Sequence, residues 1–172
     1  MSIFLTVALL HFFAVASPGP DFVLVSQQSF RYGRTVAIWT SGGIALGILF
    51  HVAISLTGLS LLLQSQPDLF WYLKLAASLY IGYLGFVSFI SNEPVDLQKI
   101  SIEKGARYLK SISTGFLINV LNPKAFIFFI TVFTLVINED TGLFIKGLLG
   151  IYMSLATFIW FSFVSILLTN HI

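Results

Sequence analysis

Two short stretches of the sequence place a formal charge beside a proline inside an apolar run. The stretch SPGPD at residues 17–21 ends on Asp21, and the stretch NPK at residues 122–124 ends on Lys124. A proline in a helix interior removes a hydrogen bond and clashes with the preceding turn, at about 3 kcal/mol or more. A charge in hydrocarbon is also unfavourable unless it meets a partner or a cavity. Both stretches are therefore candidates for a polar site.

Such breaks offer the recognition of a small molecule that carries one charge of each sign. At a break, the last carbonyls of the first half-helix carry partial negative charge, and the first amides of the second half-helix carry partial positive charge. The carbonyls suit an ammonium group and the amides suit a carboxylate. Two breaks that face each other would form a receptor for a zwitterion, with Asp21 and Lys124 adding one charge of each sign.

Each polar residue near the breaks also has a purely structural interpretation. Asp21 could be the N-cap of the second half-helix. Lys124 could extend toward the membrane surface or pair with Asp21. Asn119, one turn before the second break, could line the cavity or bond to another helix. The sequence leaves these alternatives open.

The second apolar run carries small residues and a histidine. Small residues at this spacing are typical of close helix packing in membranes, and those concerned are Gly42, Gly43 and Gly47. His51 follows Gly47 on the same face. It is a candidate proton relay together with Asp21, and the alternative is a hydrogen bond between helices. His11 is open to the same two interpretations.

The composition predicts that membrane-spanning helices position these residues. The 172-residue chain is 57% hydrophobic and 9% charged, with a mean hydropathy of +0.94, whereas a soluble domain has about 25% charged residues. The apolar runs are continuous, as in helices, and do not alternate as in barrel strands. We therefore predict an all-α integral membrane protein with five transmembrane helices, the first and fourth broken at proline, at about residues 3–30, 36–63, 69–90, 112–137 and 143–168.

The basic residues predict the orientation of the chain. Lys and Arg are enriched in cytoplasmic loops, and six of them fall on one side of the predicted membrane: Arg31, Arg34, Lys99, Lys104, Arg107 and Lys110. The other side has only Lys74 and Lys146. Loops 31–35 and 91–111 should therefore be cytoplasmic, with the N-terminus outside.

The second break repeats the first. Pro18 and Pro123 are 105 residues apart in the sequence, and the same separation relates Gly42 to Gly147. We predict a first three-helix repeat at residues 1–90 and a second, incomplete repeat at 112–172 in the opposite orientation. Paired broken helices in an inverted repeat indicate a transport site at the membrane midplane, with alternating access by rocking of the two halves.

Several classes of function lack the residues that they need. The chain has no cysteine and a net charge of only +2, so we expect neither dithiol chemistry nor a nucleic-acid partner. No spacing suggests a metal site, a phosphate-binding loop or a catalytic triad. We expect a non-enzymatic transporter without cofactor, whose energy comes from an ion gradient, whose partners are its substrate and lipid, and which could form a homodimer through its small-residue faces.

Three stretches together resemble a known family. ASPGPDF (16–22), SFRYGRTVAIWTSGGIALGILFH (29–51) and NVLNPKAFIFF (119–129) are similar to the LysE/RhtB family of amino-acid exporters. The resemblance implies six spans in a 3+3 arrangement and export of homoserine, threonine, lysine or leucine across the bacterial inner membrane, driven by protons. It implies that the substrate binds at the breaks, through Ser17, Pro18, Gly19, Pro20, Asp21, Asn122, Pro123 and Lys124. We add Asn119 to these candidate binding residues because it lies one turn before the second break.

The resemblance leaves two alternatives. The transported species could be another small solute or a cation, although Asp21 is the only acidic residue expected deep in the membrane. The predicted spans also number five where the family has six. The chain could therefore be a truncated membrane fragment that transports nothing.

Overall fold

The computed structural model describes residues 3–56, 71–72, 75, 104–133 and 141–170. Within this part of the chain the regular structure is helical, as the composition predicts. The helices are α1 (Ile3–Ala16), α2 (Pro20–Tyr32), α3 (Arg34–Ile54), α6 (Lys104–Val120), α7 (Pro123–Thr131) and α8 (Leu143–Thr169). The predicted third span at 69–90 lies almost wholly outside the described residues.

Both predicted breaks are present. The axes of α1 and α2 meet at an angle of 54°, and the part of α6 from Tyr108 to Val120 meets α7 at an angle of 58°. Pro20 and Pro123 each stand at the start of a new helix, where the missing N–H of proline leaves no helical hydrogen bond unmade. The prolines therefore begin half-helices and do not merely kink continuous ones.

Gly33 alone connects α2 to α3. It ends α2 and begins α3, with φ of 82°, a left-handed conformation that favours glycine. Its backbone N–H donates to Ser29 O over 3.1 Å. The short loop predicted at 31–35 is thus a single-residue junction between two helices.

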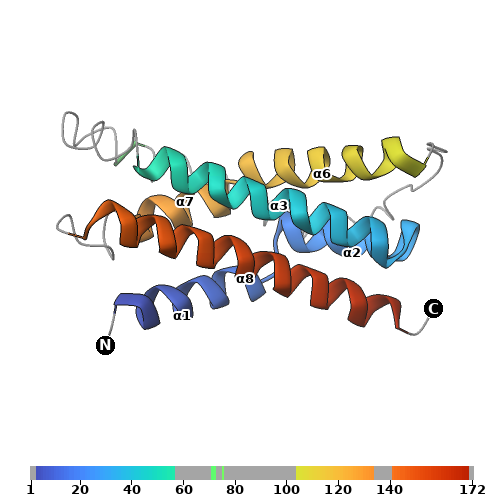
Figure 1. Cartoon of the computed structure of the whole chain (residues 1–172), viewed down its shortest axis with the longest axis horizontal. Helices are drawn as coiled ribbons and strands as arrows, with labels where there is room; N and C mark the ends of the chain where they lie inside the picture. Colours follow the sequence, from blue (N-terminus) through green and yellow to red (C-terminus); the bar gives the residue numbers. More distant parts are fainter. Residues whose placement is uncertain (1–2, 57–70, 73–74, 76–103, 134–140, 171–172) are drawn as a thin grey trace.

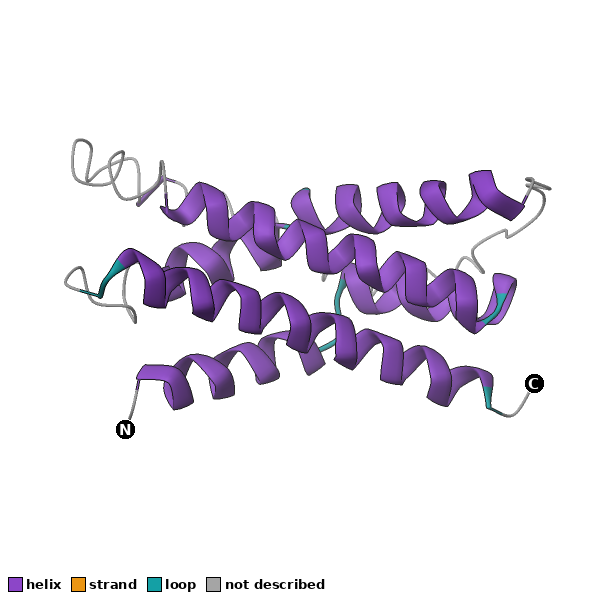
Figure 2. Ribbon diagram, in the orientation of Figure 1, coloured by secondary structure: helices purple, strands orange, loops and turns teal. Residues whose placement is uncertain are grey.

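The helices form a bundle around α3. α3 packs against α6, α8 and α2, and α8 packs in addition against α1 and α2. α1–α2 and α6–α7 run in opposite directions along the molecule (Figures 1 and 2), with the N-terminus and C-terminus at opposite ends. The four half-helices thus meet near the middle of the bundle.

Two apolar clusters hold the bundle on either side of the breaks. One joins α1, α3, α7 and α8 through buried residues that include Val7, Ile48, Phe129 and Met153. The other joins α2, α3 and α8 through Val25, Ala37, Ile44 and Phe161. Burial of each large aliphatic or aromatic side chain stabilises the fold by about 1.5–3 kcal/mol in water, but lipid replaces water here and close packing matters more.

Glycines bring α3 and α6 into close contact. A Cβ atom on Gly43 would overlap the carbonyl of Ile112, and one on Gly115 would overlap the carbonyl of Thr40. A Cβ on Gly47 would lie 2.5 Å from Asn119 Oδ1, whereas one on Gly42 would meet only the Phe158 ring at 3.9 Å. Gly43 and Gly47 thus lie at close contacts with α6, whereas Gly42 packs loosely. Because Gly43 and Gly47 already contact α6, a homodimer would have to form through other residues.

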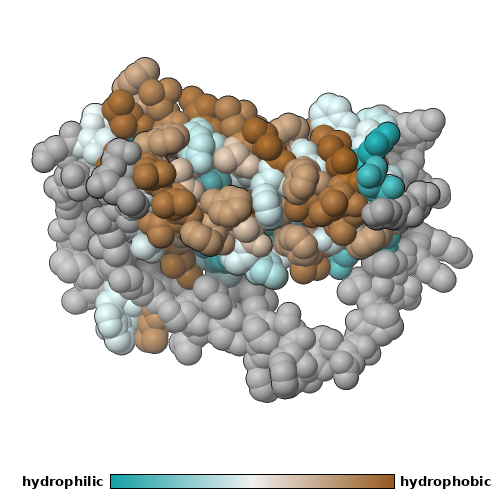
Figure 3. Space-filling view, turned by 90° about the horizontal axis from the view of Figure 1, so that it is seen from below, coloured by the Kyte–Doolittle hydropathy of each residue, from teal (hydrophilic) through white to brown (hydrophobic). Residues whose placement is uncertain are grey.

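The described helices fit a membrane protein in length and surface. Among the described residues, α3 and α8 are each long and apolar enough to span a bilayer, and the number of candidate spans rises to four if each bent pair counts as one span. Large apolar side chains such as Phe13, Phe144 and Ile159 are exposed, and Figure 3 shows apolar residues over much of the described surface. α8 matches the predicted span 143–168, and α3 covers the first part of 36–63. α6 begins before residue 112, because the basic residues assigned to the loop 91–111 include its first turns.

Candidate functional site

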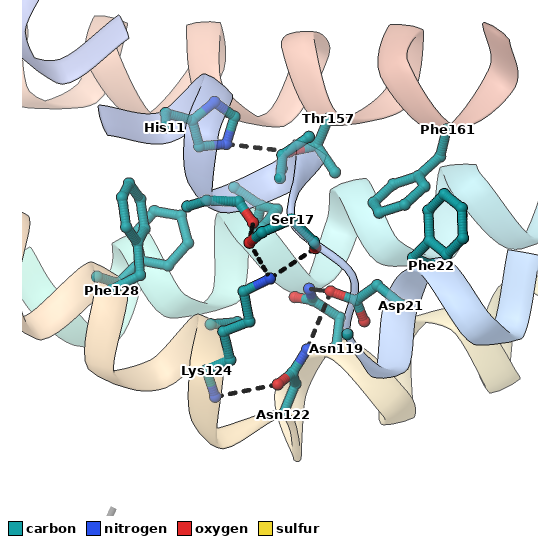
Figure 4. A pocket seen from close by; sticks show the side chains of 16 residues that line it. His11, Ser17, Asp21, Phe22, Asn119, Asn122, Lys124, Phe128, Thr157 and Phe161 are labelled. Atoms are coloured by element: carbon teal, nitrogen blue, oxygen red, sulfur yellow. Dashed lines mark hydrogen bonds between the residues drawn. The ribbon is translucent and has the colours of Figure 1, made fainter. Parts of the chain in front are cut away.

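A cavity lies where the two breaks meet (Figure 4). It offers about 40 Å³ to the centres of water-sized molecules, which is room for roughly three waters. Residues of α1, α2, α3, α6, α7 and α8 and of both breaks line it: His11, Ala14, Val15, Ser17, Gly19, Asp21, Phe22, Ile48, Asn119, Asn122, Lys124, Ala125, Phe128, Phe129, Thr157 and Phe161. Six of the nine candidate binding residues are in this set.

Asp21, in the first turn of α2, reaches across to the second break. Its Oδ2 accepts hydrogen bonds from Asn119 Nδ2 at 2.9 Å and Asn122 Nδ2 at 3.1 Å. Its Oδ1 is buried and has no hydrogen-bond partner. The alternative that Asp21 caps α2 is wrong, because Gly19 is the N-cap and no side chain caps this helix. Asp21 thus holds a carboxylate at the cavity with one oxygen unpaired.

Lys124, in the first turn of α7, reaches in the opposite direction to the first break. Its Nζ donates to Ser17 O at 2.7 Å, to Ser17 Oγ at 2.6 Å and, at the longer distance of 3.4 Å, to Pro18 O. These bonds replace the direct pair with Asp21 that the sequence left open. The ammonium group therefore occupies the carbonyl end of α1, where we expected the positive end of a ligand.

The second break has a counterpart of this contact. His51 Nε2 lies 3.0 Å from Asn119 O, and since a carbonyl can only accept, the imidazole donates. His51 also stacks on Phe129, with ring centroids 5.6 Å apart and planes at 4°. At both breaks, a side chain of the other half of the chain donates to a backbone carbonyl beside the interruption. At the second break this carbonyl, Asn119 O, also accepts from the N–H of Asn122 at 3.0 Å. His51 does not line the cavity, and its contacts fit the interhelical alternative to the proton relay.

His11, which no sequence motif singles out as a binding residue, is part of the cavity. Its Nε2 lies 3.1 Å from Thr157 Oγ1, both residues are buried, and both line the cavity. Figure 4 shows this pair above the breaks, between α1 and α8. Its position could have been suspected only from the helical spacing, which leaves His11 less than two turns before Ser17.

The remaining candidates shape the breaks. Asn122 is the N-cap of α7, with Oδ1 accepting from Lys124 N at 3.0 Å. Pro18, Pro20 and Pro123 interrupt the helices but are not in the cavity lining. Gly19 leaves room for Lys124, because a Cβ on it would lie 3.3 Å from Nζ.

The cavity can bind both signs of charge. Oxygen acceptors come from Asp21 Oδ1 and the end of α1, and a cation comes from Lys124. The first turn of α2 lacks a side-chain cap and presents partly positive backbone amides. Within the described ranges, no group of three His, Cys, Asp or Glu could hold a metal ion. The arrangement suits a small zwitterion.

The chain matches the family model of the LysE type translocator over residues 12–171. This range covers nearly all of the chain and includes both breaks.

Curated relatives match over similar lengths. The threonine efflux protein of Escherichia coli K12 is 31% identical over 96% of this chain and 81% of its own length. The threonine efflux protein of Salmonella typhimurium is also 31% identical, with the same coverage. An uncharacterized membrane protein of Haemophilus influenzae is 29% identical over 98% of this chain and 81% of its own length. No solved structure matches the chain.

Proposed function

The chain belongs to the family of LysE type translocators, and from this membership we propose that it exports amino acids through the cavity between its two breaks. Membership makes it a transporter and not an enzyme. The substrate that we propose is threonine or a close analogue such as homoserine, with lysine and leucine as further members of the test panel. Similarity to threonine efflux proteins at 31% identity supports this choice.

One observation carries the proposal. A carboxylate from one break and an ammonium from the other line the same cavity, each held by polar groups of the opposite break. An amino acid has a charge of each sign close together, so its ammonium can meet the oxygens and its carboxylate can meet Lys124 and the amides of α2. The proposed binding residues are those at the breaks: Ser17, Pro18, Gly19, Pro20, Asp21, Asn119, Asn122, Pro123 and Lys124.

The proposed mechanism is alternating access in an inverted repeat. The two bent pairs have similar angles and run in opposite directions (Figure 1), which supports two related halves of opposite orientation. Rocking of the halves would open the cavity first to one side of the membrane and then to the other. We propose that a proton gradient drives export, with Asp21 as the candidate proton carrier.

The proposed location is the bacterial inner membrane. The N-terminus would lie outside and the junction at Gly33 would lie in the cytoplasm, since Arg31 and Arg34 flank it. In the structure this junction and the start of α8 lie at opposite ends of the bundle (Figure 1), which supports a membrane between them.

Efflux from preloaded cells tests the function. Cells lacking their own threonine exporters, with or without this protein, are loaded with labelled threonine, homoserine, lysine or leucine, and the loss of label is followed. We expect faster loss of threonine or homoserine with the parent chain. Asp21→Asn should remove most of this increase, because an amide replaces the charged acceptor in the cavity. Asp140→Asn, the same chemical change far from the breaks in sequence, should leave it intact.

Membrane levels of all variants are measured by an epitope tag. Equal loss of every amino acid from cells with and without the chain, at confirmed membrane levels, would refute amino-acid export. If the parent chain speeds the loss of label and both Asp21→Asn and Asp140→Asn do so equally well, the chain exports amino acids, but the cavity between the breaks is not the binding site.

A further inference from the structure

We propose that the oxygens at the end of α1 form a binding site for a primary ammonium group, occupied by Lys124 in this structure and by the transported amino acid during export. We call Ser17 O, Ser17 Oγ and Pro18 O the ammonium site. The inference rests on the proposed function, because it assigns the two ends of that substrate. The substrate ammonium displaces Lys124, and the released Lys124 then pairs with the substrate carboxylate.

Proline makes the oxygens of this site available. In a continuous helix Ala14 O would accept from the N–H of residue 18, but Pro18 has none. Ser17 Oγ donates to Ala14 O instead, at 3.0 Å. A hydroxyl that donates its hydrogen keeps lone pairs that can accept. The bend after Pro18 likewise leaves its carbonyl and that of Ser17 free of helical partners.

The geometry fits a primary ammonium group. Such a group has three N–H donors, and the site supplies three acceptors at 2.6, 2.7 and 3.4 Å from Lys124 Nζ. These oxygens stand at the partly negative end of α1. Gly19 completes the site, since a Cβ there would lie 3.3 Å from Nζ. A quaternary ammonium has no N–H and would not fit this set of acceptors.

Two features favour departure of Lys124. It stands in the first turn of α7, where the helix dipole repels a cation. Its side chain also lines the cavity and fills the place that suits the substrate ammonium. The lysine stem is flexible, so its movement would free these oxygens and provide a partner for the carboxylate.

The first test removes the lysine and supplies its missing atoms. Lys124→Ala lacks three carbons and the ammonium, which n-propylammonium replaces. In detergent, we expect n-propylammonium to raise the melting temperature of Lys124→Ala by several degrees with a saturable dose dependence. The parent chain should show no such shift. Tetramethylammonium controls for charge and 1-propanol for the carbon chain, and neither should reproduce the shift.

A variant with the lysine stem provides a second test in case Lys124→Ala does not fold. Lys124→Met retains a chain of similar length and leaves the place of Nζ open, so the ammonium ion is the matching probe. Saturable stabilisation of this variant by ammonium but not by sodium is the expected result. No saturable shift in any folded variant, or an equal shift with tetramethylammonium, would overturn the ammonium site.

Competition tests whether the substrate uses the same site. Threonine should weaken the apparent affinity of Lys124→Ala for n-propylammonium at least tenfold at saturating concentration, and N-acetylthreonine, which lacks the ammonium, should not. Saturable n-propylammonium binding without competition would overturn the role of this site in substrate binding. Because these are binding measurements, they separate failure of the site from failure of export, which the efflux assay reports.

Discussion

Asn122 has two separate roles at the second break. Its Oδ1 caps α7 through the N–H of Lys124, and its Nδ2 donates to the carboxylate of Asp21. One amide group thus fixes the start of a half-helix and orients the charge of the opposite half. Aspartate could cap α7 equally well, but it would replace the donor with a second negative charge.

Substitutions of Asn122 separate the two roles. Asn122→Ala should lower the free energy of unfolding by about 1 kcal/mol or more through loss of the cap, and it should lower threonine efflux. Asn122→Ser restores a capping oxygen but no donor that reaches Asp21, so stability should recover while efflux stays low. Thermal unfolding in detergent and efflux from preloaded cells measure the two effects. Full recovery of efflux in Asn122→Ser would contradict the role assigned to Nδ2.

Substitutions of His51 can show whether this residue makes a structural contact or relays protons. Its imidazole donates to Asn119 O and stacks on Phe129. His51→Gln keeps an N–H donor, and we expect it to retain most efflux. His51→Leu removes this donor from the carbonyl of Asn119, which still accepts from the N–H of Asn122. We expect it to lower the free energy of unfolding by about 0.5–1.5 kcal/mol and therefore to melt at lower temperature. If both variants unfold like the parent but lose efflux, His51 carries protons.

The contact between α3 and α6 belongs to the scale of elements. Both helices contribute a glycine whose missing side chain admits the backbone of the other. This close approach holds Asn119 beside Gly47 and within reach of Asp21. The geometry of the site therefore depends on small residues that touch no ligand.

Adjacent glycines of α3 provide a matched pair of variants. Gly43→Ala should lower stability by about 1–3 kcal/mol, because the added methyl meets the backbone of α6 and must displace it. Gly42→Ala adds the same methyl in ordinary contact with Phe158 and should be neutral or slightly stabilising, since alanine favours helix. Denaturation in detergent compares them. Equal stability of the two variants would show that α3 and α6 do not pack as described.

The sequence predicts the elements better than the contacts between them. The two breaks follow from proline and from apolar runs, which are local signals. The hydrogen bonds from Lys124 to Ser17 depend on how two bent helices cross, which no local pattern encodes. For the same reason the sequence does not distinguish His11 from His51, although of these two histidines only His11 lines the cavity. The predicted span at 112–137 begins after the true start of α6 at Lys104, because the charges of Lys104 and Arg107 are typical of a loop outside the membrane.

At the scale of the whole molecule, the orientation in the membrane is the main prediction still to test. The chain has no cysteine, so single cysteines can be introduced without background. Thr35 is exposed near the junction of α2 and α3, and Gly142 has open space around a Cβ just before α8. We expect an impermeant thiol reagent to label Gly142→Cys from outside intact cells and Thr35→Cys only after lysis. The reverse pattern would invert the proposed topology.

The contacts between the two breaks also have a consequence for biosynthesis. The amide donors of Asp21 lie 98 and 101 residues later in the chain. At about 5–20 residues per second, the ribosome needs roughly 5–20 s to reach them. During this interval the carboxylate of the nascent protein has neither of its native donors. We therefore expect the first broken helix to enter the membrane with water or a proton at Asp21, and to reach its final depth only when the second break arrives.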